Sequence, residues 1–419
     1  MSHAHAPLRR SSLAALLAVL VLVLIPGWAA GKQSSHHHGK AKVHGHHGKG
    51  HHRHRHGRGH DGDHGKGKVV NVMTRNLYLG ADLGPALEAD TLSGFVEANG
   101  QILREVTLND FPTRAEGLAD EILDLQPDLV GLQEVALWRT GPPSLAPLAT
   151  GPSATTVRYD YLQELLDELN EGRGKDGKGK PQYEVVVVQD EFDLEAPADE
   201  NEVAGDNPDG NPAIADAEIN GRLTMRDVIL ARRGAGVQTW NTQSANFKVL
   251  LPAPILGATV PIKRGWTATD AKVRGSHPFR FVNTHLEAFE PTVRTAQALE
   301  LVAPTGPATS GLPVVLLGDL NSDDDTVDPV DQQAYLALLG SGMVERSTND
   351  PLSCCLDSSL LAEDAGGSEE DFDHQVDHVM TRDPEVVTLQ SSAVTGIQPV
   401  NGFWNSDHAG VFSALRFGR

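Results

Sequence analysis

Cysteine is nearly absent from this 419-residue chain, and its scarcity limits the chemistry that the sequence can support. The only two cysteines, Cys354 and Cys355, are adjacent. Two thiols cannot build a zinc site by themselves, because a structural zinc ion takes four protein ligands. The pair can form a vicinal disulfide in an oxidising compartment, or it can remain as two free thiols. The sequence leaves both states open.

Basic residues are also scarce once the N-terminal part is set aside. Residues 1–64 hold nine of the 35 Lys and Arg residues and two of the 56 Asp and Glu residues, so the remainder carries 26 basic and 54 acidic side chains. A surface with this excess of negative charge repels polyanions. This charge disfavours tight binding of nucleic acid. It is compatible with a small substrate, or with a substrate whose phosphate binds to the protein through a metal ion.

Two N-terminal segments are expected to lie outside the folded domain. Arg9 and Arg10 precede an apolar run that ends at Pro26, an order typical of a secretory signal peptide over residues 1–30. An uncleaved membrane anchor is the alternative, because the run approaches the length of a membrane span. Residues 31–67 are rich in His, Gly and Lys and are predicted to be disordered. Their histidines can bind transition metals, or the segment can be a solvated linker. The chain is therefore predicted to be secreted.

The remaining residues, 68–419, alternate short apolar runs with amphipathic stretches, which predicts an α+β domain. An acidic segment over about 190–222, rich in Pro, Gly and Asn, is interpreted as a surface insertion. The expected strands cover 69–74, a run ending at residue 134, 183–189, 227–233, 280–285, 313–319, 375–382 and 409–417, and the expected helices cover 111–126, 157–169, 291–302 and about 330–339.

Polar residues stand at the ends of several expected strands. Asn76, Glu134, His285, Asp319 and Asp377 each lie at or just past the end of an apolar run. One such placement would be unremarkable. Five of them predict a cluster at one edge of a β-sandwich, where loops hold functional groups over a rigid scaffold.

The stretch "DLNSDDD", which begins at Asp319, looks at first like a calcium-binding loop. An EF-hand needs Gly at its sixth position and Glu at its twelfth. Those positions hold Asp324 and Val330, so the EF-hand interpretation fails. Asp319 and Asn321 are better assigned to the strand end, and residues 323–325 to a solvated turn.

Six short segments in a fixed order resemble the endonuclease/exonuclease/phosphatase superfamily, the deoxyribonuclease-I-like metallophosphoesterases. They are "TRN" (74–76), "LQE" (132–134), "NTHLE" (283–287), "GDLN" (318–321), "VDHV" (376–379) and "NSDH" (405–408). The resemblance covers nearly everything from Val69 to Arg419. It implies a four-layer αββα sandwich of two mostly antiparallel sheets flanked by helices. It also implies hydrolysis of a phosphate ester by metal-activated water, with Mg²⁺, or Mn²⁺ or Ca²⁺, as the metal.

By this resemblance the metal ligands are Glu134, Asn76 and Asp407. Their oxygen atoms suit a hard cation, which one or two carboxylates usually hold. Some nuclease members carry a second carboxylate two places after the asparagine. This chain has Leu77 and Tyr78 there, so a metal ligand used in those proteins is missing.

The same resemblance assigns the catalytic roles. Asp319 is expected to act as general base, and Asn321 to hold the attacking water or a phosphate oxygen. His285 and His408 are expected to stabilise phosphate charge as imidazolium groups, and one of them to protonate the leaving group. Asp377 is expected to orient His408.

Three further residues are candidates for orienting a catalytic histidine or for binding substrate. Asp227 is the candidate partner of His285. Arg264 is either a phosphate contact or a structural arginine, and His378, where the family usually has tyrosine, either contacts substrate or packs. Arg264 belongs to the segment "RGW" (264–266). This segment and "NLYLGADL" (76–83) resemble sequence shared within one secreted bacterial branch of the superfamily.

The substrate class stays open among nucleic acid, a phospholipid headgroup and a small phosphodiester, and no obligate protein partner is evident. Phe403 and Trp404, just before Asp407, would suit a sphingomyelinase-like enzyme if they were exposed to a lipid interface. The leading hypothesis is a secreted phosphodiesterase. The alternatives are an extracellular nuclease, a sphingomyelinase-like enzyme or, from another class, a non-catalytic extracellular metal-binding protein.

Overall fold

The computed structural model describes residues 67–171, 182–323, 329–347, 352–363, 372–383 and 385–418. The predicted signal peptide, nearly all of the His-rich segment, and Asp324 and Asp325 of the expected solvated turn lie outside these residues. Within the described ranges, no helix combines the length and apolar character that a membrane crossing requires.

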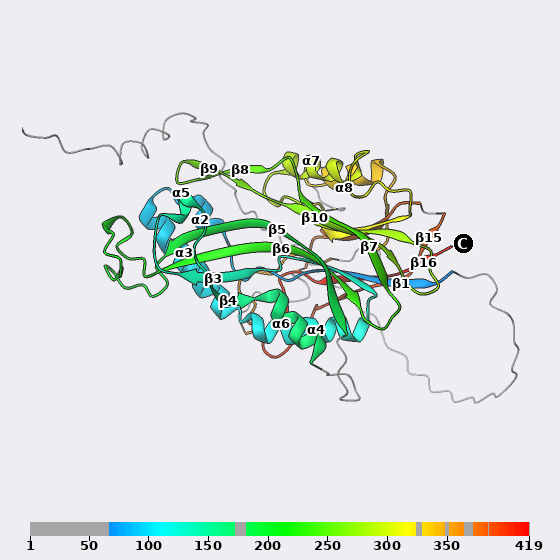
Figure 1. The fold of residues 1–419 in the computed structure, drawn as a ribbon, viewed down its shortest axis with the longest axis horizontal. Coiled ribbons are helices and arrows are strands. Elements are labelled where there is room, and N and C mark those ends of the chain that lie inside the picture. The colour runs from blue at the N-terminus through cyan, green and yellow to red at the C-terminus, as the bar shows by residue number, and fades with distance from the viewer. Residues whose placement is uncertain are drawn as a thin grey trace, which may run out of the picture. The chain divides into compact units, whose positions relative to one another are not determined.

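Two β-sheets form the middle of the domain (Figure 1). The larger has eight strands, in the order β15 (Val387–Thr395), β16 (Gly410–Phe417), β1 (Val69–Asn76), β2 (Leu129–Gln133), β6 (Ile219–Arg232), β3 (Leu137–Gly141) and β4 (Thr156–Asp160), with β5 (Tyr183–Ala198) also paired to β6. The smaller has six, in the order β13 (Val344–Glu345), β14 (Asp377–Thr381), β12 (Val314–Asp319), β11 (Phe279–His285), β10 (Gly265–Lys272) and β7 (Gln238–Asn246). A separate hairpin pairs β8 (Leu251–Ile255) with β9 (Ala258–Ile262).

Helices cover the outer face of each sheet, as Figure 1 shows. The larger sheet carries α3 (Leu92–Leu108), α4 (Phe111–Leu125) and α6 (Tyr161–Asn170), and the smaller carries α7 (Pro291–Val302) and α8 (Gln333–Gly340). The short helices are α2 (Gly84–Glu88), α5 (Pro147–Thr150) and the 3₁₀ turn η1 (Pro212–Ile214). The predicted four-layer α+β sandwich is confirmed.

Side chains on alternate positions of a strand fill different cores. In β11, Phe281 packs between the sheets, whereas its neighbour Val282 packs under α7 and α8. In β1, Val72 packs between the sheets and Met73 under the other helices. Because both faces of these strands are buried, apolar residues occupy positions on either face, with a few buried polar residues between them.

One parallel strand pair in each sheet brings the polar strand ends together. Both sheets are mostly antiparallel, but β1 runs parallel to β2, and β11 runs parallel to β12. The carboxyl ends of parallel strands meet at one edge, so Asn76 lies opposite Gln133, and His285 lies opposite Asp319. Asp377 begins β14 and does not end a strand as expected. It reaches the same edge because β14 is antiparallel to β12 and pairs Asp377 with Asp319.

Two sequence predictions were wrong in detail. Residues 157–169 were expected to be helical throughout, but β4 continues to Asp160, which caps α6 by accepting a hydrogen bond from the Gln163 amide. The segment over about 190–222 was expected to be an insertion, but β5 extends through Ala198 and β6 begins at Ile219. The bulge between Asp190 and Asp193 breaks the two-residue alternation, which hid the strand.

Candidate active site

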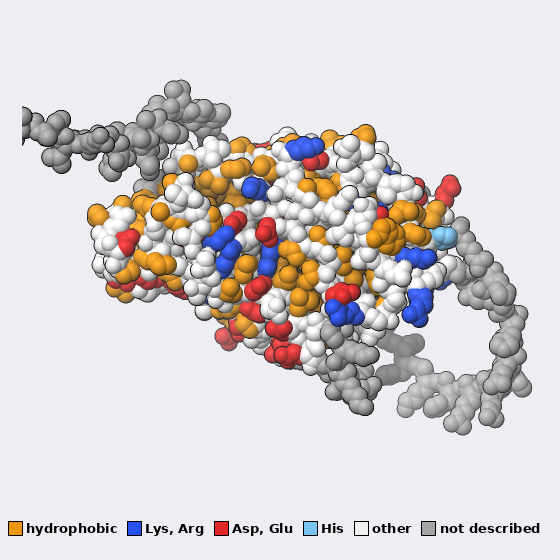
Figure 2. All heavy atoms as spheres, in the orientation of Figure 1, with side chains coloured by type: hydrophobic (Ala, Val, Ile, Leu, Met, Phe, Trp, Pro, Cys, Tyr) orange, Lys and Arg blue, Asp and Glu red, His pale blue; other side chains and the backbone are white. Residues whose placement is uncertain are grey.

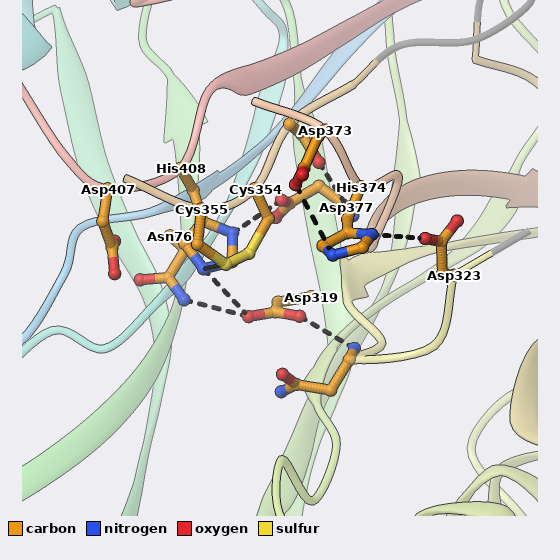
Figure 3. The surroundings of a disulfide bond; sticks show 12 residues. Asn76, Asp319, Asp323, Cys354, Cys355, Asp373, His374, Asp377, Asp407 and His408 are labelled. Carbon is orange, nitrogen blue, oxygen red and sulfur yellow. Dashed lines mark hydrogen bonds and ion pairs between the residues drawn. A yellow bond between two sulfur atoms is a disulfide. The ribbon is translucent and has the colours of Figure 1, made fainter. Parts of the chain in front are cut away.

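Asp319 lies at the centre of the converging strand ends and is 1% exposed. Its Oδ2 accepts a hydrogen bond from Asn76 Nδ2 at 3.0 Å and lies 3.4 Å from His285 Nε2 and 3.7 Å from His408 Nε2. Its Oδ1 accepts a hydrogen bond from the backbone amide of Asn321 at 2.8 Å. Figure 3 shows Asn76 and His408 directed toward Asp319. Four of the predicted site residues therefore meet at one carboxylate.

The backbone around Asp319 takes conformations that few residues adopt. Gly318 has φ of 146°, and a Cβ at this position would overlap the carbonyl oxygen of Thr284 on β11. Only glycine allows the two strands to come this close. Asn321 has φ of 47°, in the left-handed region, and its Nδ2 donates to the Leu286 carbonyl at 3.0 Å. That amide nitrogen was expected to hold water or a phosphate oxygen. It instead fixes the turn that presents Asp319.

Burial dominates the electrostatics of Asp319. Loss of hydration raises its pKa above the ordinary value, His408 opposes this rise, and Asp377 adds to it. Burial is a larger cause of this rise than the neighbouring carboxylate of Asp377. A carboxylate with raised proton affinity is a better base near neutral pH.

His408 is held by the predicted partner, Asp377. Its Nδ1 donates to Asp377 Oδ2 at 2.8 Å. Burial by itself would lower the pKa of His408, but Asp377, Asp407 and Asp319 raise it well above the ordinary value. The ring is therefore a cation near neutral pH, with Nε2–H turned toward Asp319.

The charge state of His285 differs from that of His408. Arg264 Nη1 lies 2.9 Å from its Nδ1 and 3.2 Å from its Nε2. Burial, then the charges of Arg264 and His408, lower the pKa of His285 well below the ordinary value. The ring is neutral near pH 7, so its 3.4 Å contact with Asp319 is not an ion pair. The expectation that both histidines are imidazolium groups is wrong for His285.

Two buried carboxyl groups lie behind His285. Glu191 and Asp227 are 3% and 0% exposed, and the ligand atoms of the three residues lie within 4.8 Å of one another. The two carboxyl groups lie within hydrogen-bonding reach of each other, and the Gly265 amide also approaches Glu191. Burial raises the pKa of Glu191 to about 8 and that of Asp227 well above the ordinary value. Asp227 was predicted as a partner of His285. Glu191, on the bulged part of β5, was missed.

Arg264 is enclosed beside this group and is 6% exposed. Besides His285, its Nη1 contacts Met225 Sδ at 3.6 Å, and its charge lowers the pKa values of Glu191 and Asp227. These contacts favour the structural interpretation of Arg264 over that of a phosphate contact.

The three predicted metal ligands offer a donor set that fits a hard divalent cation. Glu134 has φ of 53°, and its Oε2 accepts a hydrogen bond from the Leu79 amide at 2.7 Å. Asn76 Oδ1 accepts from the Tyr78 amide at 2.9 Å. Burial raises the pKa of Glu134, and burial followed by the charge of Glu134 raises the pKa of Asp407 to about 6. Glu134 and Asp407 are half-buried, and the charge of Glu134 disfavours that of Asp407, so a hard cation bound by their oxygens would stabilise both carboxylates.

Buried arginines, which the sequence did not identify, hold the loops that carry these ligands. Arg114 of α4 is fully buried and donates to the carbonyl oxygens of Leu77 and Asn405 at 2.8 and 2.9 Å. Arg75 pairs with Glu121 at 3.0 Å and also donates to the carbonyl oxygen of His408. A multidentate guanidinium can join two chain segments in this way.

His378 and Trp404, for which the sequence left both burial and exposure to a ligand open, are buried. His378 is fully buried, its Nδ1 lies 2.8 Å from Glu345 Oε2, and its Nε2 donates to the Ser322 carbonyl at 3.0 Å. It therefore packs and does not contact substrate. Trp404 is 3% exposed and packs edge-on against Phe372. It is not a lipid-facing aromatic residue.

Two mixed sheets that deliver oxygen ligands and a histidine-flanked carboxylate to one edge define a class of metal-dependent phosphoester hydrolases. The family model described as Endonuclease/Exonuclease/phosphatase family matches residues 94–408. The chain belongs to this family and is a metal-dependent phosphoric ester hydrolase.

The chain is also similar to solved structures, all distant in sequence. An endonuclease/exonuclease/phosphatase family protein from Bacteroides thetaiotaomicron has 14% identity and a TM-score of 0.46, over 84% of this chain and 100% of that one. A mannosyl-6-phosphatase from the same organism has 15% identity and a TM-score of 0.45, over 83% and 100%. D. rerio TDP2, solved with a single-strand DNA product, has 14% identity and a TM-score of 0.44, over 83% and 98%. No curated protein matches the sequence. Likenesses at this distance carry no argument about the substrate.

Proposed function

We propose that the chain is a secreted, Mg²⁺-dependent phosphodiesterase with Asp319 as its general base. The observation that supports this best is the environment of Asp319. It is a buried carboxylate with a raised pKa, held by Asn76 and Asn321, with a cationic His408 on one side and a neutral His285 on the other.

In this proposal Asp319 accepts the proton of the attacking water. The hydrogen bonds from Asn76 Nδ2 and the Asn321 amide fix the orientation of the carboxylate. His408 donates its Nε2–H to a phosphate oxygen, and Asp377 keeps the proton on Nδ1 and the ring in place. His285, neutral and beside the same carboxylate, supplies a hydrogen bond without adding charge.

Glu134, Asn76 and Asp407 would hold the Mg²⁺ ion, with Mn²⁺ or Ca²⁺ as alternatives. When bound, such an ion stabilises charge on phosphate oxygens and lowers the pKa of a water ligand. Burial and the charge of Glu134 raise the pKa of Asp407, and a cation bound by these two half-buried carboxylates would offset both effects.

We propose a small phosphodiester or a phospholipid headgroup as substrate in preference to nucleic acid. Residues 65–419 carry 54 acidic and 26 basic side chains, which disfavours tracking along a phosphate backbone. On the face drawn in Figure 2, Lys and Arg side chains lie singly or beside acidic ones and form no continuous stripe.

The test is hydrolysis by the purified chain with Mg²⁺ of four substrates: bis-p-nitrophenyl phosphate, p-nitrophenyl phosphate, sphingomyelin vesicles and plasmid DNA. We expect turnover of a non-nucleic phosphodiester, abolished by a chelator. Asp319→Asn should lose at least about 10²-fold in kcat/KM, because a positioned base contributes about 10²–10⁴-fold. Asp331→Asn, at a half-exposed aspartate paired with Arg294, is the control and should retain activity. Full activity in Asp319→Asn would refute its role, and cleavage of DNA alone would refute the substrate class.

Secretion rests on the signal-peptide pattern of residues 1–30 alone. The expected result is recovery of the chain, shortened at its N-terminus, from the culture medium of a producing cell. Retention of the full-length chain in the membrane fraction would favour the anchor instead.

A further inference from the structure

The cysteine pair lies beside the catalytic histidine. Cys354 and Cys355 are joined as a disulfide, and Cys355 Sγ lies 3.9 Å from His408 Nε2 (Figure 3). Cys354 is 4% exposed, whereas Cys355 is open to solvent. Neither sulfur has a part in the proposed hydrolysis, so their position requires a separate explanation.

Backbone hydrogen bonds fix the cysteine segment to the catalytic loops. The Ala409 amide donates to the Ser353 carbonyl at 2.7 Å, and the Leu356 amide donates to the Asp407 carbonyl at 3.0 Å. The Asp377 amide donates to Ser353 Oγ at 3.2 Å. The segment is therefore tied on one side to the loop of His408 and on the other to the first residue of β14. The sulfurs are held near the histidine by the fold.

Only one nitrogen of His408 is available to a ligand. Nδ1 is engaged by Asp377 at 2.8 Å, and Nε2 faces both Cys355 Sγ and Asp319 Oδ2, the latter at 3.7 Å. A histidine whose second nitrogen donates to a carboxylate is the usual form of a metal-binding imidazole.

The spacing of these atoms matches a tetrahedral site for a soft cation. Zinc lies about 2.3 Å from sulfur and about 2.0–2.1 Å from nitrogen or oxygen, so the sulfur–nitrogen edge of its tetrahedron is roughly 3.6 Å and the nitrogen–oxygen edge roughly 3.4 Å. The corresponding distances here are 3.9 and 3.7 Å. The ligand atoms of Cys354, Cys355 and His408 all lie within 4.8 Å of one another. Small movements of the side chains would complete the site.

We propose that the reduced Cys354–Cys355 pair and His408 form a binding site for a thiophilic divalent cation such as Zn²⁺ or Cd²⁺. A dithiol opens the site by giving two electrons and two protons to the disulfide, and it leaves as a cyclic disulfide. Metal binding then releases three protons, one from each thiol and one from Nε2 of the His408 imidazolium, as both sulfurs become thiolate ligands and Nε2 becomes a neutral nitrogen ligand. Asp319 or water takes the fourth position. Mg²⁺ does not compete there, because it prefers oxygen ligands.

The consequence for activity rests on the proposed function. A cation bound to Nε2 prevents His408 from donating to phosphate, so the reduced enzyme is inhibited by Zn²⁺. The disulfide withholds both sulfurs and keeps the catalytic site open. The pair would thus link the redox state of the surroundings to metal sensitivity.

The test uses the full chain, reduced with dithiothreitol, freed of it under anaerobic conditions and titrated with Cd²⁺. A thiolate-to-metal charge-transfer band in the ultraviolet reports the binding. Because the chain has only two cysteines, the band can arise only from this pair, and the histidine-rich segment does not produce it. We expect one Cd²⁺ per chain in the reduced protein and no band in the oxidised protein or in a Cys354→Ser/Cys355→Ser variant.

His408→Asn separates the proposed site from a plain dithiol. The variant should bind Cd²⁺ at least about tenfold more weakly, because even an indirect partner of a metal ligand contributes about 10–100-fold. Unchanged binding in this variant, no band, or loss of the circular dichroism of the folded protein on reduction would each overturn the proposal.

Zn²⁺ should also lower the activity of the reduced wild type, but not of the oxidised protein or the double serine variant, relative to each protein's own rate. The band needs no substrate, so it stands even if the proposed hydrolysis fails.

Discussion

The two histidines that flank Asp319 lie at similar distances from it but differ in charge state. His408 donates to a carboxylate at 2.8 Å, and nearby acidic groups raise its pKa well above the ordinary value. His285 faces a guanidinium at 2.9 Å, and burial with that charge lowers its pKa well below the ordinary value. The same residue type at the same strand edge is thus a cation on one side and neutral on the other.

The difference explains how Asp319 can remain a base. A cation within about 4 Å of a buried carboxylate lowers its proton affinity. His408 has this effect on Asp319, but burial outweighs it. A second imidazolium at His285 would add to the lowering and leave a weaker base. The neutral state of His285 therefore suits catalysis, and burial together with the charge of Arg264 enforces it.

The largest expected effect in this comparison is the loss of stability when each histidine is replaced by asparagine. In His408→Asn the buried Asp377 carboxylate loses its cation, and loss of one partner of a buried pair typically costs about 3–5 kcal/mol. His285→Asn removes a neutral ring and should cost only about 1–2 kcal/mol. Urea unfolding at pH 7 measures both. Both variants should lose at least about 10²-fold in activity, so equal losses of stability would be the outcome that contradicts the assigned charges.

Asp377→Asn gives the next largest effect. The amide oxygen can still accept from His408 Nδ1, but it no longer stabilises the cation, so kcat/KM should fall by about 10–100-fold while the fold is kept. Asp373→Asn is the matched control, because Asp373 lies four residues earlier, is largely exposed and lies 3.5 Å from His374 Nε2. It should stay near wild-type activity. Similar losses in both variants would mean that Asp377 acts through the segment and not through His408.

The ligands and catalytic residues at strand ends could be predicted because one physical rule places them. Asn76 ends β1 and Glu134 follows β2, and His285 and Asp319 end β11 and β12; these strands form the two parallel pairs. Each strand is buried on both faces, so its apolar run stops where the polar residue begins. The sequence also indicated the Asp377–His408 contact, although only through the family resemblance.

Residues that act from inside irregular strands could not be predicted. Glu191 lies in β5 next to the bulge between Asp190 and Asp193, where the alternation that marks a strand fails. The charge state of His285 depends on Arg264, which is 21 positions away in sequence and meets it only because β10 pairs with β11. Arg114 looks like any polar residue of an amphipathic helix until its four carbonyl partners are known.

The pH dependence of stability tests the carboxyl pair behind His285. Glu191 has an ordinary pKa of 4.5, and burial raises it to about 8 in the folded protein. Between these values the unfolded chain has lost the proton while the folded chain still binds it. Rising pH therefore destabilises the folded wild type, by at most about 1.4 kcal/mol per pH unit. Glu191→Gln removes this dependence, so its stability relative to wild type should increase from pH 5 to pH 8 in urea unfolding.

Glu195→Gln, on the same strand, is the comparison for this prediction, because the pKa of Glu195 is shifted in the opposite direction. Burial would raise the pKa of Glu195, but hydrogen bonds from Ala154, Asn220 and Ser153 outweigh it and lower the pKa below 4.5. Its contribution is present above the unfolded pKa and is lost as pH falls through the folded value. The stability of Glu195→Gln relative to wild type should therefore be constant from pH 5 to pH 8 and improve only at lower pH. If Glu191→Gln follows that course instead, the Glu191 carboxyl is ionised in the folded protein. The two sides of Asp319 would then not differ as described.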